Sequence, residues 1–197
     1  MEPLKGKGLI IVVSAPSGAG KKAVLDKVRA ADPNLCYSVS ATTRHPRPGE
    51  VEGRDYFFMS DETFRDKVAA GEFIEYADVH GRLYGTLKAE LARLVGSGKD
   101  VVLELDTEGA ENVKRLRSDA VLIFIAPPTF DELRKRLEAR GTDSPDQIDV
   151  RLETARREMA LTDMYDHIVV NDVLGEAARE VKEIIASARR EASGQER

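Results

Sequence analysis

A glycine-rich segment near the start of the chain has the residue types that bind the phosphates of a nucleotide. It spans residues 14–22 and reads S-A-P-S-G-A-G-K-K, between a short apolar run and a helical pattern. In the general loop G-x-x-x-x-G-K-[ST], glycines let backbone N–H groups turn toward the phosphates and the lysine reaches the β- and γ-phosphates. Gly20 and Lys21 match this pattern, whereas Ala15 and Lys22 do not. The spacing favours a phosphate site over the alternative, a strand-to-helix turn without a ligand.

The lysine at position 22 bears on how a magnesium ion would be held beside those phosphates. Most such loops have Ser or Thr here, whose hydroxyl binds Mg²⁺, and an ammonium group cannot bind a cation. The following residue, Ala23, supplies no hydroxyl. Two interpretations stay open. Either phosphates and water alone hold the ion, since Mg²⁺ retains water readily, or Lys22 simply points to solvent from the first helical turn.

Short apolar runs rich in β-branched residues surround this loop and predict strands buried on both faces of a parallel sheet. These runs are Leu9–Val13, Val101–Leu105, Val121–Ala126 and Ile168–Val170. Apolar residues at helical spacing predict helices over Lys21–Ala31, Phe130–Arg140 and Leu174–Ala188. Alternating strands and helices indicate an α/β fold whose core is a doubly wound parallel sheet with a phosphate-binding loop.

Two segments interrupt the alternation. Short aromatic strands over Tyr56–Met59 and Phe73–Tyr76, with a helix around Phe64–Val68, predict a small inserted subdomain at about 37–86. Two charged helices joined by a loop predict a helical lid at about 129–161. The 197 residues would then form one domain over 1–197, whose core comprises about 1–36, 87–128 and 162–197.

A second polar cluster, over residues 38–56, combines hydroxyls, arginines and prolines. It reads S-V-S-A-T-T-R-H-P-R-P-G-E and is followed by G-R-D-Y. This run closely resembles the guanylate kinase family, whose pattern is S-x-S-x-T-T-R-x-P-R-x-G-E followed by G-x-D-Y. The S-A-P-S-G-A-G-K form of the phosphate loop also occurs in that family, so Ala15 fits. Further matches extend the resemblance over about residues 8–188.

The resemblance implies a set of side chains that bind GMP. Forked guanidinium groups of Arg44 and Arg47 suit a dianionic phosphate, and Glu75 would face the guanine N1–H and 2-amino group. Adenine lacks that N1–H, so a buried carboxylate would be left unpaired and would discriminate against it. The full set implied for GMP is Ser40, Arg44, Arg47, Tyr56, Glu75, Tyr84, Thr86 and Asp106.

The resemblance also implies an ATP site, whose residues are Ala15, Pro16, Ser17, Gly18, Ala19, Gly20, Lys21, Lys22 and Asn171. The lid pattern R-L-x-x-R-G-T-D followed by R-L supplies arginines, and the implied catalytic residues are Lys21, Arg44, Arg136, Arg140 and Arg151. Arg136 and Arg140 are one helical turn apart and share a helix face. Glu104 stands where the family usually has Asp. It would reach Mg²⁺, the cofactor implied with ATP, through water, and no residue is expected to bind the metal directly.

Composition narrows the classes of partner. A net charge of −5 argues against non-specific nucleic-acid binding, and no apolar stretch approaches the ~18 residues of a membrane span. The only cysteine, Cys36, cannot form an intramolecular disulfide, which favours a reducing compartment. We therefore expect a cytoplasmic protein, a monomer or homodimer, that binds ATP and GMP or dGMP.

Three functional hypotheses remain at this level. The first is an active ATP:GMP phosphotransferase. The second is a catalytically impaired GMP-binding or protein-interaction module of the same fold, suggested by Lys22. The third is a kinase for another nucleoside monophosphate, which shares the phosphate loop but leaves the run from Ser40 to Tyr56 unexplained.

Overall fold

The computed structural model describes residues 8–79, 81–141 and 143–194. Thr142 of the R-G-T-D motif and the ends of the predicted domain, residues 1–7 and 195–197, lie outside the described residues.

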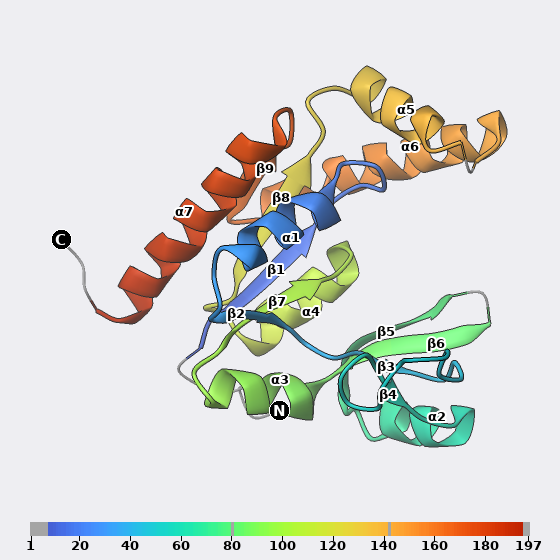
Figure 1. Cartoon of the computed structure of the whole chain (residues 1–197), viewed down its shortest axis with the longest axis vertical. Helices are drawn as coiled ribbons and strands as arrows, with labels where there is room; N and C mark the ends of the chain where they lie inside the picture. Colours follow the sequence, from blue (N-terminus) through green and yellow to red (C-terminus); the bar gives the residue numbers. More distant parts are fainter. Residues whose placement is uncertain (1–7, 80, 142, 195–197) are drawn as a thin grey trace.

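The centre of the molecule is a five-stranded parallel sheet with the order β2-β7-β1-β8-β9 (Figure 1). Its strands are β1 (Ile10–Ser14), β2 (Leu35–Tyr37), β7 (Asp100–Glu104), β8 (Val121–Ala126) and β9 (His167–Val170). The four predicted runs each form a strand here, so the parallel sheet is confirmed. The three-residue strand β2 was not predicted, and it ends at Tyr37, just inside the segment expected to begin the insertion.

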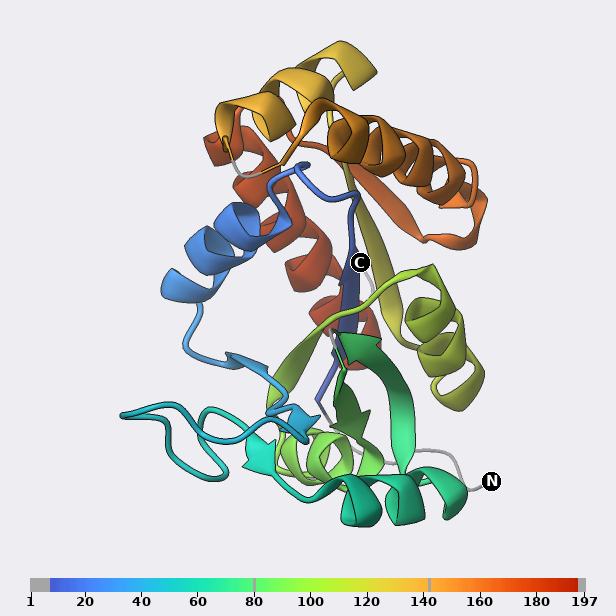
Figure 2. The same ribbon diagram turned by 90° about the vertical axis from the view of Figure 1, so that its right-hand side faces the viewer.

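Helices cover both faces of this sheet, as a doubly wound fold requires. One face packs against α1 (Lys21–Ala30) and α7 (Leu174–Ala192), and the other against α3 (Lys88–Gly96) and α4 (Thr107–Leu116). Helix α1 and helix α4 lie on opposite sides of the sheet in Figure 2. The α/β fold class is therefore confirmed, although α3 and α4 were not predicted.

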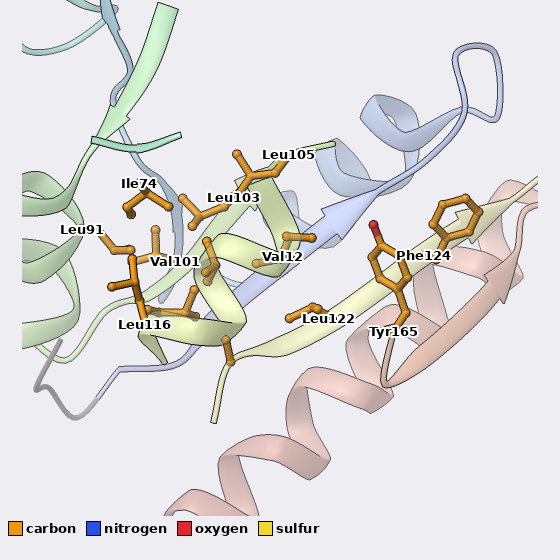
Figure 3. Packing of buried hydrophobic residues seen from close by; sticks show 14 of the residues in the cluster. Val12, Ile74, Leu91, Val101, Leu103, Leu105, Leu116, Leu122, Phe124 and Tyr165 are labelled. Carbon is orange, nitrogen blue, oxygen red and sulfur yellow. The ribbon is translucent and has the colours of Figure 1, made fainter. Parts of the chain in front are cut away.

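Alternating strand residues feed two separate cores, because successive side chains point to opposite faces. On strand β1, Ile10 and Val12 belong to the α3 and α4 side, whereas Ile11 and Val13 belong to the α1 and α7 side. Figure 3 shows the first core, where the Phe124 and Tyr165 rings lie 5.1 Å apart. The sheet is therefore packed on both faces, which fixes the positions of the carboxyl ends of its strands.

A second, four-stranded sheet lies apart from the first, with the order β4-β3-β6-β5. Its strands are β3 (Ala41–Thr42), β4 (Phe57–Phe58), β5 (Phe73–Val79) and β6 (Arg82–Leu87). Helix α2 (Asp61–Ala69) begins at the N-cap Ser60 and packs the Phe64 ring on Phe73, with centroids 4.3 Å apart. This small core, and not the central sheet, organises the segment.

Helices α5 (Phe130–Ala139) and α6 (Pro145–Met159) form a pair with a core of their own. Leu133 and Leu137 of α5 are fully buried against Ile148 and Leu152 of α6. A capping box at Ser144 and a proline at the first helical position start α6. A short 3₁₀ turn, η1 (Thr162–Met164), then leads the chain back to β9. The helical pair and the second sheet lie at opposite ends of the molecule (Figures 1 and 2).

Candidate active site

The glycine-rich segment connects the carboxyl end of β1 to the first turn of α1, as its sequence predicts. Gly18 and Gly20 have φ angles of 98° and 88°, in the left-handed region that favours glycine. A Cβ atom at Gly18 would lie 2.9 Å from Leu133 Cδ1, and one at Gly20 would contact the Asn171 amide. The loop therefore needs glycine at both positions, for its conformation and for close packing against α5 and the end of β9.

Asn171 fastens this loop from the far edge of the sheet. Its side-chain Nδ2 donates a buried 2.7 Å hydrogen bond to the Ala19 carbonyl. The residue is only 5% exposed, at the point where β9 ends. In this structure the Asn171 amide supports the predicted ATP loop directly.

The two lysines of the loop point in different directions. Lys21 Nζ lies 3.6 Å from Glu104 Oε2 at the end of β7. Lys22 Nζ lies 2.8 Å from Asp26 Oδ2 one turn along α1, and its side chain is 80% exposed. Of the two interpretations of Lys22, the structure thus shows the one in which it points to solvent.

The helical pair brings two of its predicted arginines to the loop. Arg151 Nη1 donates to Ser17 Oγ at 2.7 Å, and its Nη2 donates to Asp143 Oδ1 at 3.2 Å. Arg136 Nη1 donates to the Asn171 carbonyl at 3.0 Å. The third, Arg140, is exposed at the end of α5. Arg151 therefore reaches the loop directly, and Arg136 reaches it through Asn171, before any ligand is bound.

A cavity of about 370 Å³ lies between the second sheet and the carboxyl end of β7. It is lined by five of the residues predicted to bind GMP, namely Ser40, Tyr56, Glu75, Tyr84 and Thr86. Glu104 lines the same cavity, which connects it to the Lys21 side of the site. Asp106 and Glu75 also line a smaller cavity of about 280 Å³.

Glu75 is the carboxylate whose environment is most unusual here. Thr86 Oγ1 donates to its Oε1 at 2.6 Å, and burial raises the pKa of the Glu75 carboxyl, with a further contribution from the charge of Asp106. Asp106 itself caps α4 by accepting from the Gly109 N–H at 2.8 Å. A Cβ at Gly109 would lie 3.2 Å from Asp106 Oδ1 and 3.4 Å from Glu75 Cγ. This glycine lets both acidic side chains approach the helix start.

The two arginines predicted to bind the GMP phosphate differ in how buried their side chains are and in what they contact. Arg44 is half-buried, pairs with Glu50 Oε1 at 2.8 Å and lies 5.3 Å from the centroid of the Tyr56 ring. Arg47 has an exposed side chain, and its backbone N–H donates to Glu50 Oε2 at 2.7 Å. The hydrogen bonds from Arg44 and from the Arg47 backbone lower the pKa of the Glu50 carboxyl.

Sequence reasoning did not assign roles to two residues that shape the site. Glu50 orients Arg44 and could have been found, because it is the final glutamate of the motif that carries the resemblance. Gly109 makes room for Glu75 and Asp106, and nothing in its local sequence indicates that contact.

Within the described residues, no three His, Cys, Asp or Glu side chains cluster closely enough to hold a metal ion. No helix among them is long and apolar enough to span a membrane.

Comparisons with known proteins agree on one family. The family model described as Guanylate kinase matches residues 7–188. A guanylate kinase of Thiobacillus denitrificans is 45% identical over 195 residues, which cover 99% of this chain and 93% of that protein. One of Thermotoga maritima is 45% identical over 183 residues, covering 93% and 88%.

A solved structure supports the same relationship. The crystal structure of guanylate kinase from Anaplasma phagocytophilum superposes with a TM-score of 0.68 at 33% sequence identity. The match covers 94% of this chain and 88% of that one.

Proposed function

This chain belongs to the guanylate kinase family, and we propose that it transfers the γ-phosphoryl group of ATP to GMP, giving ADP and GDP. One observation carries the proposal. The cavity lined by the half-buried Glu75 and by Tyr56 and Tyr84 opens at the same sheet edge as the phosphate loop, and Glu104, which also lines it, pairs with Lys21 of the loop. A phosphate acceptor bound there would meet the end of a polyphosphate held by the loop.

ATP binds at the loop between β1 and α1. The loop from Ala15 to Lys22 surrounds the phosphates with the backbone N–H groups of its non-proline residues. The N-terminus of α1 adds its dipole, and Lys21 bridges the β- and γ-phosphates. Arg151 and Arg136 already contact the loop region, so they can neutralise the phosphates as charge shifts during transfer. Arg140 joins them when the helical pair closes, and Asn171 keeps the loop in shape.

GMP binds in the cavity of the second sheet. Arg44, Arg47, Tyr56 and Tyr84 hold its phosphate, and Ser40, Thr86 and Asp106 assist at the base. Glu75 accepts hydrogen bonds from the guanine N1–H and 2-amino group. These two bonds compensate the unfavourable desolvation of the carboxylate. Adenine offers no N1–H donor, so AMP would leave that carboxylate unpaired.

Magnesium fits the residues at the meeting point of the two sites. Glu104 presents carboxylate oxygens at the sheet edge with a side chain 34% exposed, and the Lys22 ammonium points away into solvent. Glu104 would therefore hold the ion through water, and the phosphates would supply the remaining ligands. When bound, the ion neutralises part of the phosphate charge.

The reaction needs positioning and charge neutralisation more than proton transfer. The acceptor is a phosphate whose second pKa is about 6, so it is already anionic near neutral pH. The insertion at about 37–86 and the lid at about 129–161 would close over the core and exclude water, which limits wasteful hydrolysis of ATP. Both substrates are small metabolites of the cytoplasm, where we place this protein as a monomer or homodimer.

A coupled assay of ADP release with ATP and Mg²⁺ tests the proposal. GMP and dGMP should support turnover, whereas AMP and UMP should not. Tight GMP binding without turnover would instead identify a catalytically impaired module, and turnover with AMP or UMP would indicate another monophosphate kinase.

A further inference from the structure

A buried tyrosine hydroxyl next to the phosphoryl-transfer site has no role in the function proposed above. Tyr37 is the last residue of β2, and its hydroxyl is buried with no hydrogen-bond partner among the described residues. A buried hydroxyl without a partner is unfavourable by the desolvation of that group, so such groups are rare and call for a physical reason.

The register of the sheet places Tyr37 and Glu104 on the same face. Tyr37 pairs with Val102 in the parallel register of β2 and β7, so their side chains share one sheet face. Glu104 is two residues further along β7 and returns to that same face, which α1 covers. Tyr37 and Glu104 also line the same cavity. Glu104 therefore supplies a carboxylate acceptor on the same sheet face and the same cavity as the Tyr37 side chain.

The electrostatics of the tyrosine agree with this placement. Burial raises the pKa of the Tyr37 hydroxyl, and the negative charges of Glu104 and Asp26 raise it further, so the hydroxyl keeps its proton and acts as a donor. Arg29 lies 4.8 Å from the centroid of the Tyr37 ring and fixes the ring from the outer side. The ring cannot easily turn away, because it also packs in the core beneath α1.

Glu104 needs a second hydrogen-bond donor because Lys21, its present partner, is also required to bind the phosphates of ATP. Lys21 lies 3.6 Å away, but Lys21 must move to the phosphates when ATP binds. When Lys21 moves to the polyphosphate, it no longer holds Glu104 in place. Glutamate has one more rotatable bond than the aspartate usual in the family, so its carboxylate is free to follow the ammonium group. A neutral donor fixed on a strand of the central sheet would stay in place through the whole cycle.

We propose that Tyr37 is a positioning residue for phosphoryl transfer, whose buried hydroxyl donates to the Glu104 carboxylate and holds it apart from Lys21 when ATP binds. The inference rests on the proposed function, since it assigns Lys21 to the phosphates of ATP. Tyr37 also lines the cavity proposed for GMP, and in this proposal it acts on the reaction through Glu104, so the KM for GMP separates the two roles.

A double-mutant cycle of Tyr37→Phe and Glu104→Ala tests this pairing. Tyr37→Phe keeps the ring and removes only the hydroxyl, and should lower kcat/KM for ATP about tenfold, the size expected for one hydrogen bond to a charged group, with KM for GMP unchanged. In the Glu104→Ala background the same change should have no further effect. Equal losses in both backgrounds, or a raised KM for GMP, would overturn the proposal.

Binding of ATP in EDTA, followed by calorimetry, gives a readout that does not depend on turnover. Tyr37→Phe should raise the Kd of ATP severalfold, because an unheld Glu104 stays on Lys21 and competes with the phosphates. With Glu104→Ala this difference should vanish, and its persistence would contradict the pairing. A protein that fails to phosphorylate GMP would refute the proposed function, yet the same binding cycle would still decide this inference.

Tyr165→Phe is the matched control. Tyr165 is a second buried tyrosine with a buried hydroxyl, and it lies in the core on the opposite face of the sheet. Its hydroxyl should show no coupling to Glu104→Ala in either measurement. Equal coupling for both tyrosines would indicate a general loss of packing and would overturn the specific role of Tyr37.

Discussion

The phosphate loop and the segment that we propose to bind GMP, at about 37–86, reach the same site by different routes. The loop is held from three sides before any ligand arrives, by Asn171 on the Ala19 carbonyl, by Arg151 on Ser17 and by the leucines packed against Gly18. In the second segment, Ser40 and Tyr56 lie next to strands β3 and β4, which have two residues each, and Arg44 is paired with Glu50 of its own loop.

This difference indicates how the binding free energies of ATP and GMP are used on the donor and acceptor sides. The donor side is preorganised, so ATP need not order the loop, and a substitution there should act on catalysis directly. On the acceptor side we expect GMP to redirect Arg44 from Glu50 toward its phosphate, much as ATP would redirect Lys21 from Glu104. Substitutions there should act mainly on GMP binding and base selectivity.

The largest effect should come from Lys21→Met. Removing the ammonium that bridges the β- and γ-phosphates should lower kcat by about 10³-fold, as for other electrostatic groups at a transition state. GMP affinity measured by calorimetry should stay unchanged, because Lys21 belongs to the donor side. Lys27→Met, at an exposed lysine of α1, is the control and should retain full turnover. If Lys21→Met also lost GMP binding, the separation between an ATP-binding donor side and a GMP-binding acceptor side would be contradicted.

The next largest effect should come from Glu75→Gln. Loss of the carboxylate should lower kcat/KM for GMP about 100-fold, equivalent to two hydrogen bonds to a charged acceptor, and should narrow the preference for GMP over AMP. The same assays with both nucleotides measure this. Glu72→Gln, an exposed glutamate near the start of β5, is the control, and an equal loss there would contradict a specific role for Glu75.

The raised pKa of Glu75 also predicts a pH dependence. The folded protein holds this proton more tightly than the unfolded chain does, so stability is lost as pH rises from the ordinary glutamate range through the raised value. GMP binding should improve over the same interval, because it needs the carboxylate. Glu75→Gln should therefore raise Tm relative to the unsubstituted protein at neutral pH, and this gain should disappear in acid. Thermal melts across pH check it, and a gain that persists in acid would contradict the assignment.

A smaller effect is expected from Gly18→Ala. The left-handed backbone and the contact with Leu133 should together destabilise the loop by about 2 kcal/mol and raise KM for ATP, with little change for GMP. Gly98→Ala adds a side chain at a similar φ of 81° with no atom within 4 Å of the new Cβ, so it isolates the backbone effect. If both variants raise KM for ATP equally, packing against the helical pair does not shape the loop.

The smallest effect should come from Glu50→Gln. The amide still accepts a hydrogen bond but no longer pairs with Arg44 as a charge, so KM for GMP should rise about fivefold and kcat should change little. Glu52→Gln, an exposed neighbour, serves as the control in the same assay. A lower KM for GMP would show that Glu50 competes with the phosphate more than it orients Arg44.

Sequence periodicity predicted the parts of the fold that are long and buried. The β-branched runs placed four strands of the parallel sheet because each is covered on both faces. Strand β2 and the two-residue strands β3 and β4 are too short to show a period, and they form by pairing with longer neighbours. Helices α3 and α4 were missed although Leu91 and Val95 have helical spacing.

The candidate site was predicted as a set of residues, but not as a set of contacts. Motif resemblance identified Glu75 and Thr86, and the structure then joined them by a hydrogen bond. The contacts of Asn171 with Ala19 and of Arg151 with Ser17 join residues 152 and 134 positions apart. Such distant pairs depend on the order of strands in the sheet, which local spacing does not encode.

The hydrogen bond from Asn171 to Ala19 has a consequence for how the protein is made. The nucleotide loop leaves the ribosome before the residue that fastens it, which follows 152 positions later. During synthesis the loop must therefore wait until β9 has been added to the sheet. A nascent or truncated chain that ends before this strand would carry the complete loop sequence and still lack its final shape.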